Sequence, residues 1–325
     1  MKILITGAAG FVGFHSATRL LAGGHQILGI DNLNDYYDVS LKMARLAQLE
    51  HAENFSFLKL DLADRQGMAR LFSENAFDVV LHLGAQAGVR YSIENPFAYV
   101  DSNVTGTLTV LEGCRHAGIK HLIYASSSSV YGANTKQPFS IEDRVDSPVS
   151  LYAATKKADE MMCRTYAHLY RIPITGLRFF TVYGPWGRPD MAYFKFADAI
   201  RAGRSIDVYN HGDMKRDFTY IDDIVDGIEA LVSHPAPGLS DETPHRVYNL
   251  GNNSPEQLLE MINLLESALG KEAKKNFLPM QPGDVYATYA DIAASTRDFG
   301  FAPKVNLATG LARFADWYRG YYEAS

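Results

Sequence analysis

Cysteine, tryptophan and long apolar runs are all scarce in this chain of 325 residues. It has two cysteines and two tryptophans. Neither Cys114 nor Cys163 has a partner at a metal-like spacing, so we expect buried thiols rather than a disulfide or a nucleophile. No apolar run reaches the roughly 20 residues of a membrane span. The stretch "MKILITGAAG" enters a glycine-rich motif at once, so we expect no signal peptide.

The chain also has no excess of basic residues. The 31 Lys and Arg residues are outnumbered by 37 Asp and Glu residues, for a net charge of −6. This balance argues against nucleic acid as a partner. The ten histidines show no metal-like clustering, so no metal is expected. A hydrophobic content of 47% and a charged content of 21% are typical of a soluble globular protein. We expect a cytoplasmic protein with no membrane partner.

Apolar runs typical of strands alternate with helical patterns through the first half of the chain. The apolar runs are continuous, as in strands that are buried on both faces. We expect strands at 2–7, 25–30, 55–62, 78–84, 121–127 and 174–180, and helices at 11–23, 64–74, 96–117 and 150–171. Repeated β-α units predict an α/β fold with a doubly wound parallel sheet of the Rossmann type.

A glycine motif follows the first of these strands. "TGAAGFVG" places Gly7, Gly10 and Gly13 between a strand and a helix. Glycines let backbone N–H groups approach a pyrophosphate, and a helix N-terminus favours negative charge. A glycine turn in an unrelated α/β protein would look similar. However, Asp31 ends the second strand about twenty residues further on, as a ribose-binding acid does.

The cofactor expected from this motif is NAD. No arginine stands beside Asp31, so the 2′-phosphate of NADP would meet a carboxylate. The residues expected to bind the cofactor are Gly7, Gly10, Phe11, Val12, Gly13, Asp31, Asn32, Asp61, Leu62, Gln86 and Lys156.

Beyond Thr181 the pattern changes to helices near 191–203, 221–233, 255–269 and 307–323, separated by short apolar pieces. We expect a smaller, mixed α/β C-terminal lobe that binds the substrate. The expected boundaries are 1–180 for the NAD-binding domain, with 217–250 packing back on it. Residues 181–216 and 251–325 then form the second lobe.

The stretch "SLYAATKKADE" sets Tyr152 four residues before Lys156. Residues four apart on a helix lie on one face. A cation beside a phenol favours the phenolate, which can take a proton from an alcohol. Alone, the same spacing is typical of an ordinary exposed helix face.

With the glycine motif, Asp31 and Y-x-x-x-K in one chain, the sequence resembles the extended short-chain dehydrogenase/reductases of the nucleotide-sugar epimerase/dehydratase group, over essentially its whole length. The resemblance implies that Tyr152 is the catalytic base, and that Lys156 favours its phenolate and holds the nicotinamide ribose. It implies that Ser127 of "SSSSVYG" completes the catalytic set. It also implies a homodimer formed through the helices near 96–117 and 150–171.

The residues after Ser127 separate the branches of this family. Dehydratases carry an Asp-Glu pair there and UDP-glucuronate decarboxylases a Glu, where this chain has Ser128 and Ser129. The stretches "DNLNDYYD", "AQAGVRYSIENP", "PWGRPDMA" and "KRDFTYIDDIV" resemble UDP-glucuronate 4-epimerases. The resemblance implies interconversion of UDP-glucuronate and UDP-galacturonate: transient C4 oxidation with tightly bound NAD, rotation of the 4-keto sugar, and re-reduction.

A uronate substrate would need a binding group for its carboxylate. The planar fork of Arg188 suits a carboxylate, although a surface arginine in a proline-rich loop is the plain alternative. Ser128, Ser129 and Thr181 offer further donors.

Fewer sequence features indicate the residues that bind the nucleotide part of the substrate. The resemblance implies that Arg216 binds the pyrophosphate and that Tyr209 packs on uracil. Arg90 is a candidate for the diphosphate or the carboxylate, and equally for a solvated arginine. Gln281 stands where many relatives have a second arginine.

Three alternatives remain open. They are a 4-epimerase for UDP-glucose or a UDP-N-acetylhexosamine, a UDP-glucuronate decarboxylase, and a non-catalytic NAD- or nucleotide-sugar-binding protein on the same fold.

Overall fold

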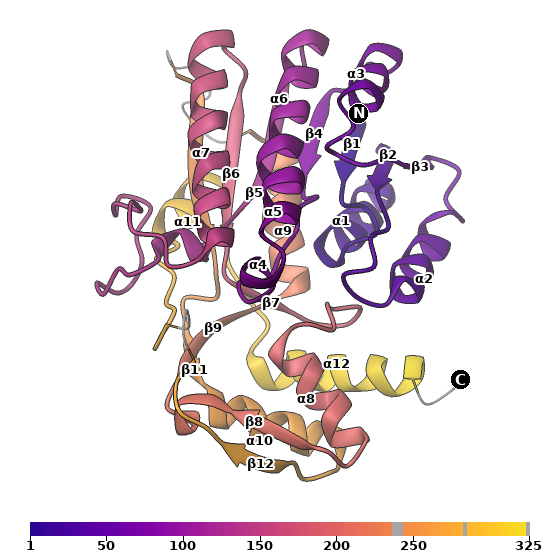
Figure 1. Cartoon of the computed structure of the whole chain (residues 1–325). Coiled ribbons are helices and arrows are strands. Elements are labelled where there is room, and N and C mark those ends of the chain that lie inside the picture. The colour runs from indigo at the N-terminus through magenta and orange to yellow at the C-terminus, as the bar shows by residue number, and fades with distance from the viewer. Residues whose placement is uncertain (236–242, 282–284, 323–325) are drawn as a thin grey trace.

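A seven-stranded sheet with every strand parallel forms the centre of the larger lobe (Figure 1). The computed structural model describes residues 1–235, 243–281 and 285–322. The strand order is β10-β6-β5-β4-β1-β2-β3. The strands are β1 (Lys2–Thr6), β2 (Gln26–Asp31), β3 (Phe55–Lys59), β4 (Val79–His82), β5 (His121–Ser127), β6 (Ile174–Phe179) and β10 (His245–Leu250). The doubly wound parallel sheet expected from the sequence is thereby confirmed.

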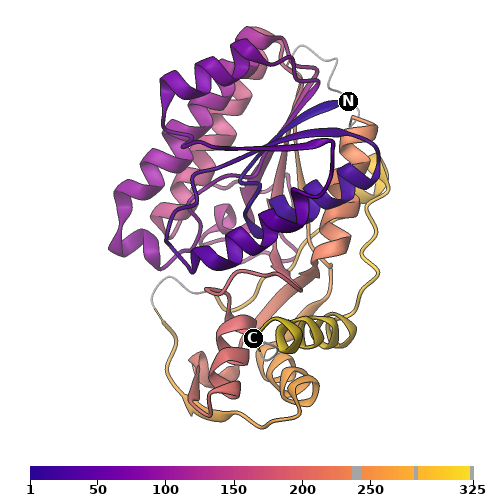
Figure 2. The same cartoon turned by 90° about the vertical axis from the view of Figure 1, so that its right-hand side faces the viewer.

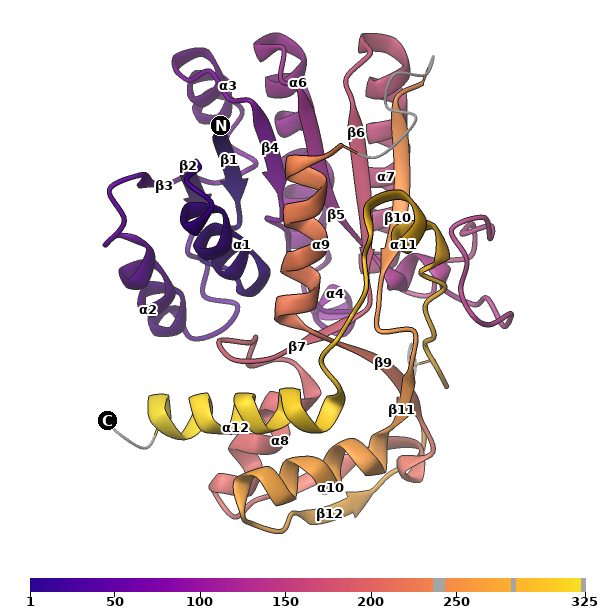
Figure 3. The same cartoon turned by 180° about the vertical axis from the view of Figure 1, so that it is seen from behind.

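Helices cover both faces of this sheet (Figures 2 and 3). One layer holds α3 (Arg65–Glu74), α6 (Gly106–Ala117) and α7 (Leu151–Tyr170). The other holds α1 (Phe11–Ala22), α2 (Val39–Leu49) and α9 (Ile221–Ser233). Within β1, Ile3 and Ile5 belong to one hydrophobic cluster and Leu4 to another. Because both faces are buried, the strands are continuously apolar. The edge strand β3 is the exception, since all five of its residues are partly or fully exposed.

The expected helix at 96–117 has an irregular start. It consists of α5 (Pro96–Tyr99), a π-helical turn η1 (Val100–Thr105) and α6. Asn103 in this turn accepts a hydrogen bond from the backbone N–H of Gln86 (2.8 Å) and donates to Thr155 Oγ1 (3.0 Å). The π turn therefore lies where the helix holds the loop that follows β4.

Other differences concern elements that the apolar pattern did not reveal. α2 was not expected, because Lys42 and Arg45 occupy two of its buried positions. α11 (Ala293–Phe299) was also missed, and the helix expected from 255 begins only at Leu258 because Pro255–Gln257 form strand β11.

The smaller lobe mixes helices and strands and lies beyond the carboxyl ends of the parallel strands (Figure 1). β7 (Thr181–Tyr183), β9 (Lys215–Tyr220) and β11 form one sheet, and β8 (Ser205–Val208) pairs with β12 (Lys274–Phe277). Its helices are α8 (Ala192–Arg201), α10 (Leu258–Leu269) and α12 (Leu307–Tyr322). β1 has β2 on one side and β4 on the other, so the order in which successive strands join the sheet reverses beside β1. Parallel sheets bind ligands at such a point.

Candidate active site

A cleft of about 1220 Å³ is lined by the carboxyl ends of the parallel strands and by the smaller lobe. Its lining includes residues from the glycine motif, α7, the serine run and the loop after β7. Every catalytic, cofactor-binding and substrate-binding residue proposed from the sequence lies along it: Gly7, Gly10, Phe11, Val12, Gly13, Asp31, Asn32, Asp61, Leu62, Gln86, Arg90, Ser127, Ser128, Ser129, Tyr152, Lys156, Thr181, Arg188, Tyr209 and Arg216. Gln281 is not among the described residues of this lining.

The glycine motif forms a cradle that side chains would fill. Gly7 has a φ of 70°, and a Cβ there would lie 2.8 Å from the backbone of Gly84. A Cβ on Gly13 would overlap the carbonyl oxygen of Gly7. Gly10 is the N-cap of α1 and makes no side-chain cap. The first N–H groups of α1 are therefore available to an anion in the cleft, which fits the pyrophosphate of a dinucleotide.

Asp31 ends β2 at the cleft. Its Oδ1 accepts from the backbone N–H of Leu33 (2.8 Å), and Lys42 Nζ lies 3.8 Å from the same oxygen. Lys42 Nζ also donates to Asn34 Oδ1 (2.8 Å). The sequence pattern gave no sign of this lysine, because α2 was not expected. The contacts with Leu33 and Lys42 are both made by Oδ1, which leaves Oδ2 to accept from a ribose hydroxyl, and the pocket fits NAD.

A second buried residue, Asp159, binds the side chain of Lys156. Its Nζ donates to the carbonyl oxygen of Ala125 (2.9 Å) and to Asp159 Oδ2 (3.1 Å). Burial disfavours the charged lysine, but Asp159 and Tyr152 outweigh this effect and raise the pKa of Lys156. Asp159 was missed in the sequence, although its i,i+3 spacing from Lys156 was a usable signal.

The hydroxyl of Ser127 lies at the end of β5. Ser127 Oγ accepts from the backbone N–H of Ser129 (3.1 Å) and from Ser129 Oγ (2.9 Å). Because the oxygen accepts in both bonds, its own proton remains available to an oxygen in the cleft. Ser128 and Ser129 belong to the short 3₁₀ turn η2 (Ser128–Tyr131) that follows the strand.

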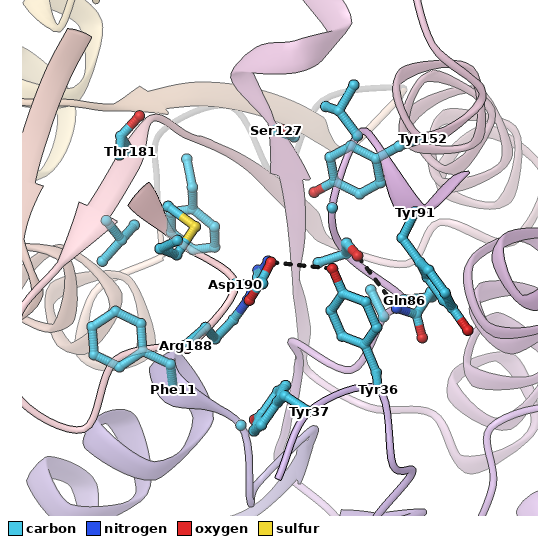
Figure 4. A pocket seen from close by; sticks show the side chains of 18 of the residues that line it. Phe11, Tyr36, Tyr37, Gln86, Tyr91, Ser127, Tyr152, Thr181, Arg188 and Asp190 are labelled. Carbon is cyan, nitrogen blue, oxygen red and sulfur yellow. Dashed lines mark hydrogen bonds and ion pairs between the residues drawn. The ribbon is translucent and has the colours of Figure 1, made fainter. Parts of the chain in front are cut away.

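The loop after β7 carries Arg188 into the cleft, where it meets an acid (Figure 4). Arg188 Nε donates to Asp190 Oδ1 (2.9 Å) and Nη2 to Asp190 Oδ2 (2.5 Å). The hydroxyl of Tyr36 donates to the same Oδ2 (3.3 Å). The sequence had indicated Arg188 as a carboxylate ligand but had not paired it with Asp190 or Tyr36.

Two further arginines lie near the expected nucleotide position. The guanidinium of Arg90 lies over the ring of Tyr209, 5.0 Å from its centroid. Tyr209 begins the turn η3 (Tyr209–Gly212) of the smaller lobe, so this contact crosses the cleft. Arg216 Nη1 donates to the carbonyl oxygens of Lys215 (2.8 Å) and Tyr286 (3.2 Å).

Arg45 of α2 joins the glycine motif to the loop that bears Arg188. The side chain is fully buried and donates to the carbonyl oxygens of Trp186 (3.1 and 2.7 Å), Gly187 (3.0 Å) and Ala9 (2.9 Å). It also donates to the hydroxyl of Tyr37 (2.8 Å). These five bonds use all five N–H groups of a guanidinium.

Across residues 1–235, 243–281 and 285–322, no group of three His, Cys, Asp or Glu side chains is placed to hold a metal. Within those ranges no helix is both long enough and apolar enough to cross a bilayer.

Comparison of the whole chain with known proteins identifies its family. A model of the NAD-dependent epimerase/dehydratase family matches residues 3–251. A probable UDP-glucuronate 4-epimerase of Rhizobium meliloti is 49% identical, over 99% of this chain and 98% of its own. The structure of a Bacillus cereus UDP-glucuronic acid 4-epimerase in complex with UDP-glucuronic acid and NAD has a TM-score of 0.91 and 36% identity, over 99% of this chain and 100% of that one. A Thermotoga maritima UDP-glucose 4-epimerase structure with UDP-glucose has a TM-score of 0.88 and 28% identity, over 98% and 99%. The chain belongs to the NAD-dependent epimerase/dehydratase family.

Proposed function

We propose that this protein is a UDP-glucuronate 4-epimerase, which interconverts UDP-glucuronate and UDP-galacturonate. One observation carries the proposal: Tyr152, Ser127 and Arg188 line a single cleft. Arg188 and Tyr152 are close enough for their charges to interact. A phenol, a hydroxyl donor and a guanidinium that can bind a carboxylate thus line the same cleft. The Rhizobium meliloti and Bacillus cereus relatives named above support the same activity.

The chain's own residues hold the cofactor and move the C4 proton. The first turn of α1 binds the pyrophosphate, and Asp31 and Lys156 bind the two riboses. Bound NAD supplies the acceptor, and later the donor, of the C4 hydride. The Tyr152 phenolate takes the proton of the C4 hydroxyl, and Ser127 donates a hydrogen bond to the C4 oxygen. After the 4-keto sugar has turned about its diphosphate link and been reduced on its other face, Tyr152 returns the proton to the C4 oxygen, which completes the opposite epimer.

The carboxylate of the substrate needs restraint during this cycle. A 4-keto uronate is a β-keto acid, which loses CO2 when its C–CO2 bond lies along the carbonyl π orbital. Thr181 and Ser128 offer neutral donors to the carboxylate, and Arg188 offers charge-assisted ones. This chain has Ser128 and Ser129 where dehydratases and decarboxylases have an acid.

The two lobes divide these tasks. We assign NAD to residues 1–180 together with 217–250, the first residues of which complete β9 of the smaller lobe, and the UDP-sugar to residues 181–216 and 251–325. Arg216 contacts the diphosphate, and Tyr209, with Arg90 over its ring, packs on the uracil.

A homodimer is part of the same proposal. The surface of α6 and α7 exposes Leu108, Met161 and Leu169, and the neighbouring α5 exposes Phe97. A second copy of these helices would bury this apolar surface. We place the dimer in the cytoplasm, where the free thiols Cys114 and Cys163 would remain reduced.

The alternatives are less consistent with the cleft. An epimerase for neutral UDP-hexoses, such as the Thermotoga maritima relative, has little use for a charged group at Arg188. A decarboxylase would need an acid at Ser129. A non-catalytic protein would have no need of Tyr152, Lys156 and Ser127 together.

The test is to incubate the purified protein with UDP-glucuronate, without added NAD, and to follow the anomeric signals by NMR. UDP-galacturonate with no UDP-pentose is expected, and Tyr152→Phe should yield neither product. UDP-pentose as the main product would establish the decarboxylase instead. No reaction, even with added NAD, combined with turnover of UDP-glucose would establish a neutral-hexose epimerase. No turnover of any UDP-sugar would favour the non-catalytic protein.

A further inference from the structure

Two segments that are far apart in the sequence meet in the lining of the cleft. Tyr36 belongs to "DNLNDYYD" after β2, and Asp190 belongs to "PWGRPDMA" after β7. The hydroxyl of Tyr36 donates to Asp190 Oδ2 at 3.3 Å, and Figure 4 shows the two side chains pointing toward each other. Asp190 in turn holds Arg188. The three side chains form a chain of contacts in the order Tyr36, Asp190, Arg188.

Asp190 occupies one edge of the Arg188 guanidinium and leaves another edge unused by this pair. The two bonds use Nε and one proton of Nη2. The protons of Nη1 and the second proton of Nη2 are not used by Asp190. A guanidinium can bind a second carboxylate in bidentate fashion through this Nη1–Nη2 edge. Arg188 can therefore hold Asp190 and a substrate carboxylate at the same time.

The protonation states suit this arrangement. Burial alone would raise the pKa of Asp190, but Arg188 outweighs it and lowers the pKa, so Asp190 is a carboxylate. Burial and the charge of Asp190 both raise the pKa of Tyr36, so Tyr36 remains a donor. The side chains of Arg188 and Asp190 are 25% and 17% exposed, so solvent screens the pair only in part.

The position of Tyr36 is itself tightly defined. Its ring packs against that of Tyr91 with centroids 4.7 Å apart. Gly88 has a φ of 101°, and a Cβ there would lie 2.6 Å from the Tyr36 hydroxyl. The hydroxyl therefore occupies space that only a glycine at position 88 leaves open.

We propose that Asp190 is a positioning residue that makes Arg188 selective for a carboxylated sugar. By binding the Nε edge, Asp190 fixes the plane of the guanidinium so that its Nη1–Nη2 edge faces the sugar. Tyr36 fixes Asp190 in turn. The inference rests on the proposed function, since it assumes that the substrate is a UDP-uronate.

The test compares three ligands on the NAD-containing protein by calorimetry: UDP, UDP-glucose and UDP-glucuronate. Asp190→Asn keeps the side-chain shape and one acceptor but removes the charge. We expect this variant to bind UDP-glucuronate about tenfold more weakly, which is the order expected for one well-placed charge-assisted hydrogen bond. UDP and UDP-glucose should bind it as they bind the wild type. Tyr36→Phe should also weaken the binding of UDP-glucuronate, but by a smaller factor than Asp190→Asn does.

The chain contains a matched control. Tyr248 donates to Asp298 Oδ2 (2.8 Å), and Arg297 binds Asp298 through Nε (2.6 Å) and Nη2 (3.0 Å). This is the same Tyr–Asp–Arg arrangement, and Asp298 is not among the described residues that line the cleft. Asp298→Asn should leave the affinities for all three ligands unchanged.

The outcomes separate this inference from the proposed function. Equal weakening of UDP, UDP-glucose and UDP-glucuronate in Asp190→Asn would overturn the inference, because it would mean a general loss of loop structure. Unchanged affinities would overturn it as well. In both cases epimerisation of UDP-glucuronate by the wild type would leave the proposed function standing. If the wild type turns over only neutral UDP-sugars, the proposed function fails and the inference fails with it.

Discussion

Lys156 and Asp159 form a buried ion pair across one turn of α7, with Nζ 3.1 Å from Oδ2 and side chains only 3% and 1% exposed. The carboxylate helps to keep a buried ammonium charged. Removing it by Asp159→Asn should therefore lower the pKa of Lys156.

The pH dependence of epimerisation reports this change. We expect the alkaline limb of the kcat profile of Asp159→Asn to move to lower pH by on the order of one unit. The control is Asp316→Asn, which removes an exposed i,i+3 pair with Arg319 on α12 and should not move the limb. A lower kcat with an unmoved limb would show that Asp159 only packs against Lys156.

Gly13→Ala should abolish cofactor retention. Its Cβ would overlap the carbonyl oxygen of Gly7, so the loop that receives the pyrophosphate must shift. The measurement is the NAD released from purified, heat-denatured protein, for which we expect little or none. Gly320→Ala on α12 meets nothing within 4 Å and should retain NAD fully. Wild-type NAD content in Gly13→Ala would contradict this account of the cradle.

Arg45→Met should destabilise the protein strongly. It leaves the carbonyl oxygens of Trp186, Gly187 and Ala9 without this donor in a buried site. The free energy of unfolding in urea should fall by about 3 kcal/mol or more, since each unsatisfied buried polar group costs about 1–3 kcal/mol. Arg319→Met, at a partly exposed arginine, should cost less than about 1 kcal/mol. Similar losses in the two variants would mean that the Arg45 bonds contribute little.

Thr181→Ala should change the products rather than the fold. Thr181 lines the cleft at the start of β7, where its hydroxyl can restrain the substrate carboxylate. We expect a larger share of UDP-pentose in the NMR assay, because the freed carboxylate can align with the C4 carbonyl. Thr309→Ala, on the exposed face of α12, provides the comparison. An unchanged ratio of UDP-pentose to UDP-galacturonate would exclude this role for Thr181.

Acid should unfold the protein through its buried histidines. Burial lowers the pKa of His82 to about 3, and those of His121 and His245 to about 4. Their stability contribution is therefore complete above the unfolded pKa of about 6.5 and is lost as the pH falls toward the folded values. The slope is at most about 1.4 kcal/mol per pH unit for each histidine.

The urea midpoint should accordingly fall as the pH drops from about 6.5 to about 4, the window set by the unfolded and folded pKa values of His121 and His245. In His121→Gln the decline per pH unit should be shallower, because one titrating group is gone. The exposed His51 provides the control, since His51→Gln should keep the wild-type decline. A flat profile in the wild type would contradict the burial argument.

Features that lie along one element were predictable from the sequence. The glycine motif spans the end of one strand and the start of one helix, and Tyr152 and Lys156 are one turn apart on α7. Local spacing decides which of these groups share a face. The parallel sheet followed from continuous apolar strands alternating with helices. Residue roles remain proposals, although every residue proposed from the sequence for catalysis, cofactor binding or substrate binding lies along the cleft.

Contacts between separate loops were not predictable in this way. Tyr36 and Asp190 are 154 residues apart, and Arg45 and Trp186 are 141 apart. α2 escaped notice because buried Lys42 and Arg45 interrupt its apolar face. Their burial is tolerable only because Asn34, Ala9 and the loop after β7 supply acceptors.

The sequence by itself determined the sheet, the dinucleotide cradle and the Tyr152–Lys156 pair, because each depends on spacing within one or two adjacent elements. Only the tertiary structure decided that Tyr36 would reach Asp190 and that Arg45 would bind the loop after β7. Those pairings depend on where side chains point after the lobes have packed. Burial then makes each pairing strong, because a charge removed from water must find a partner.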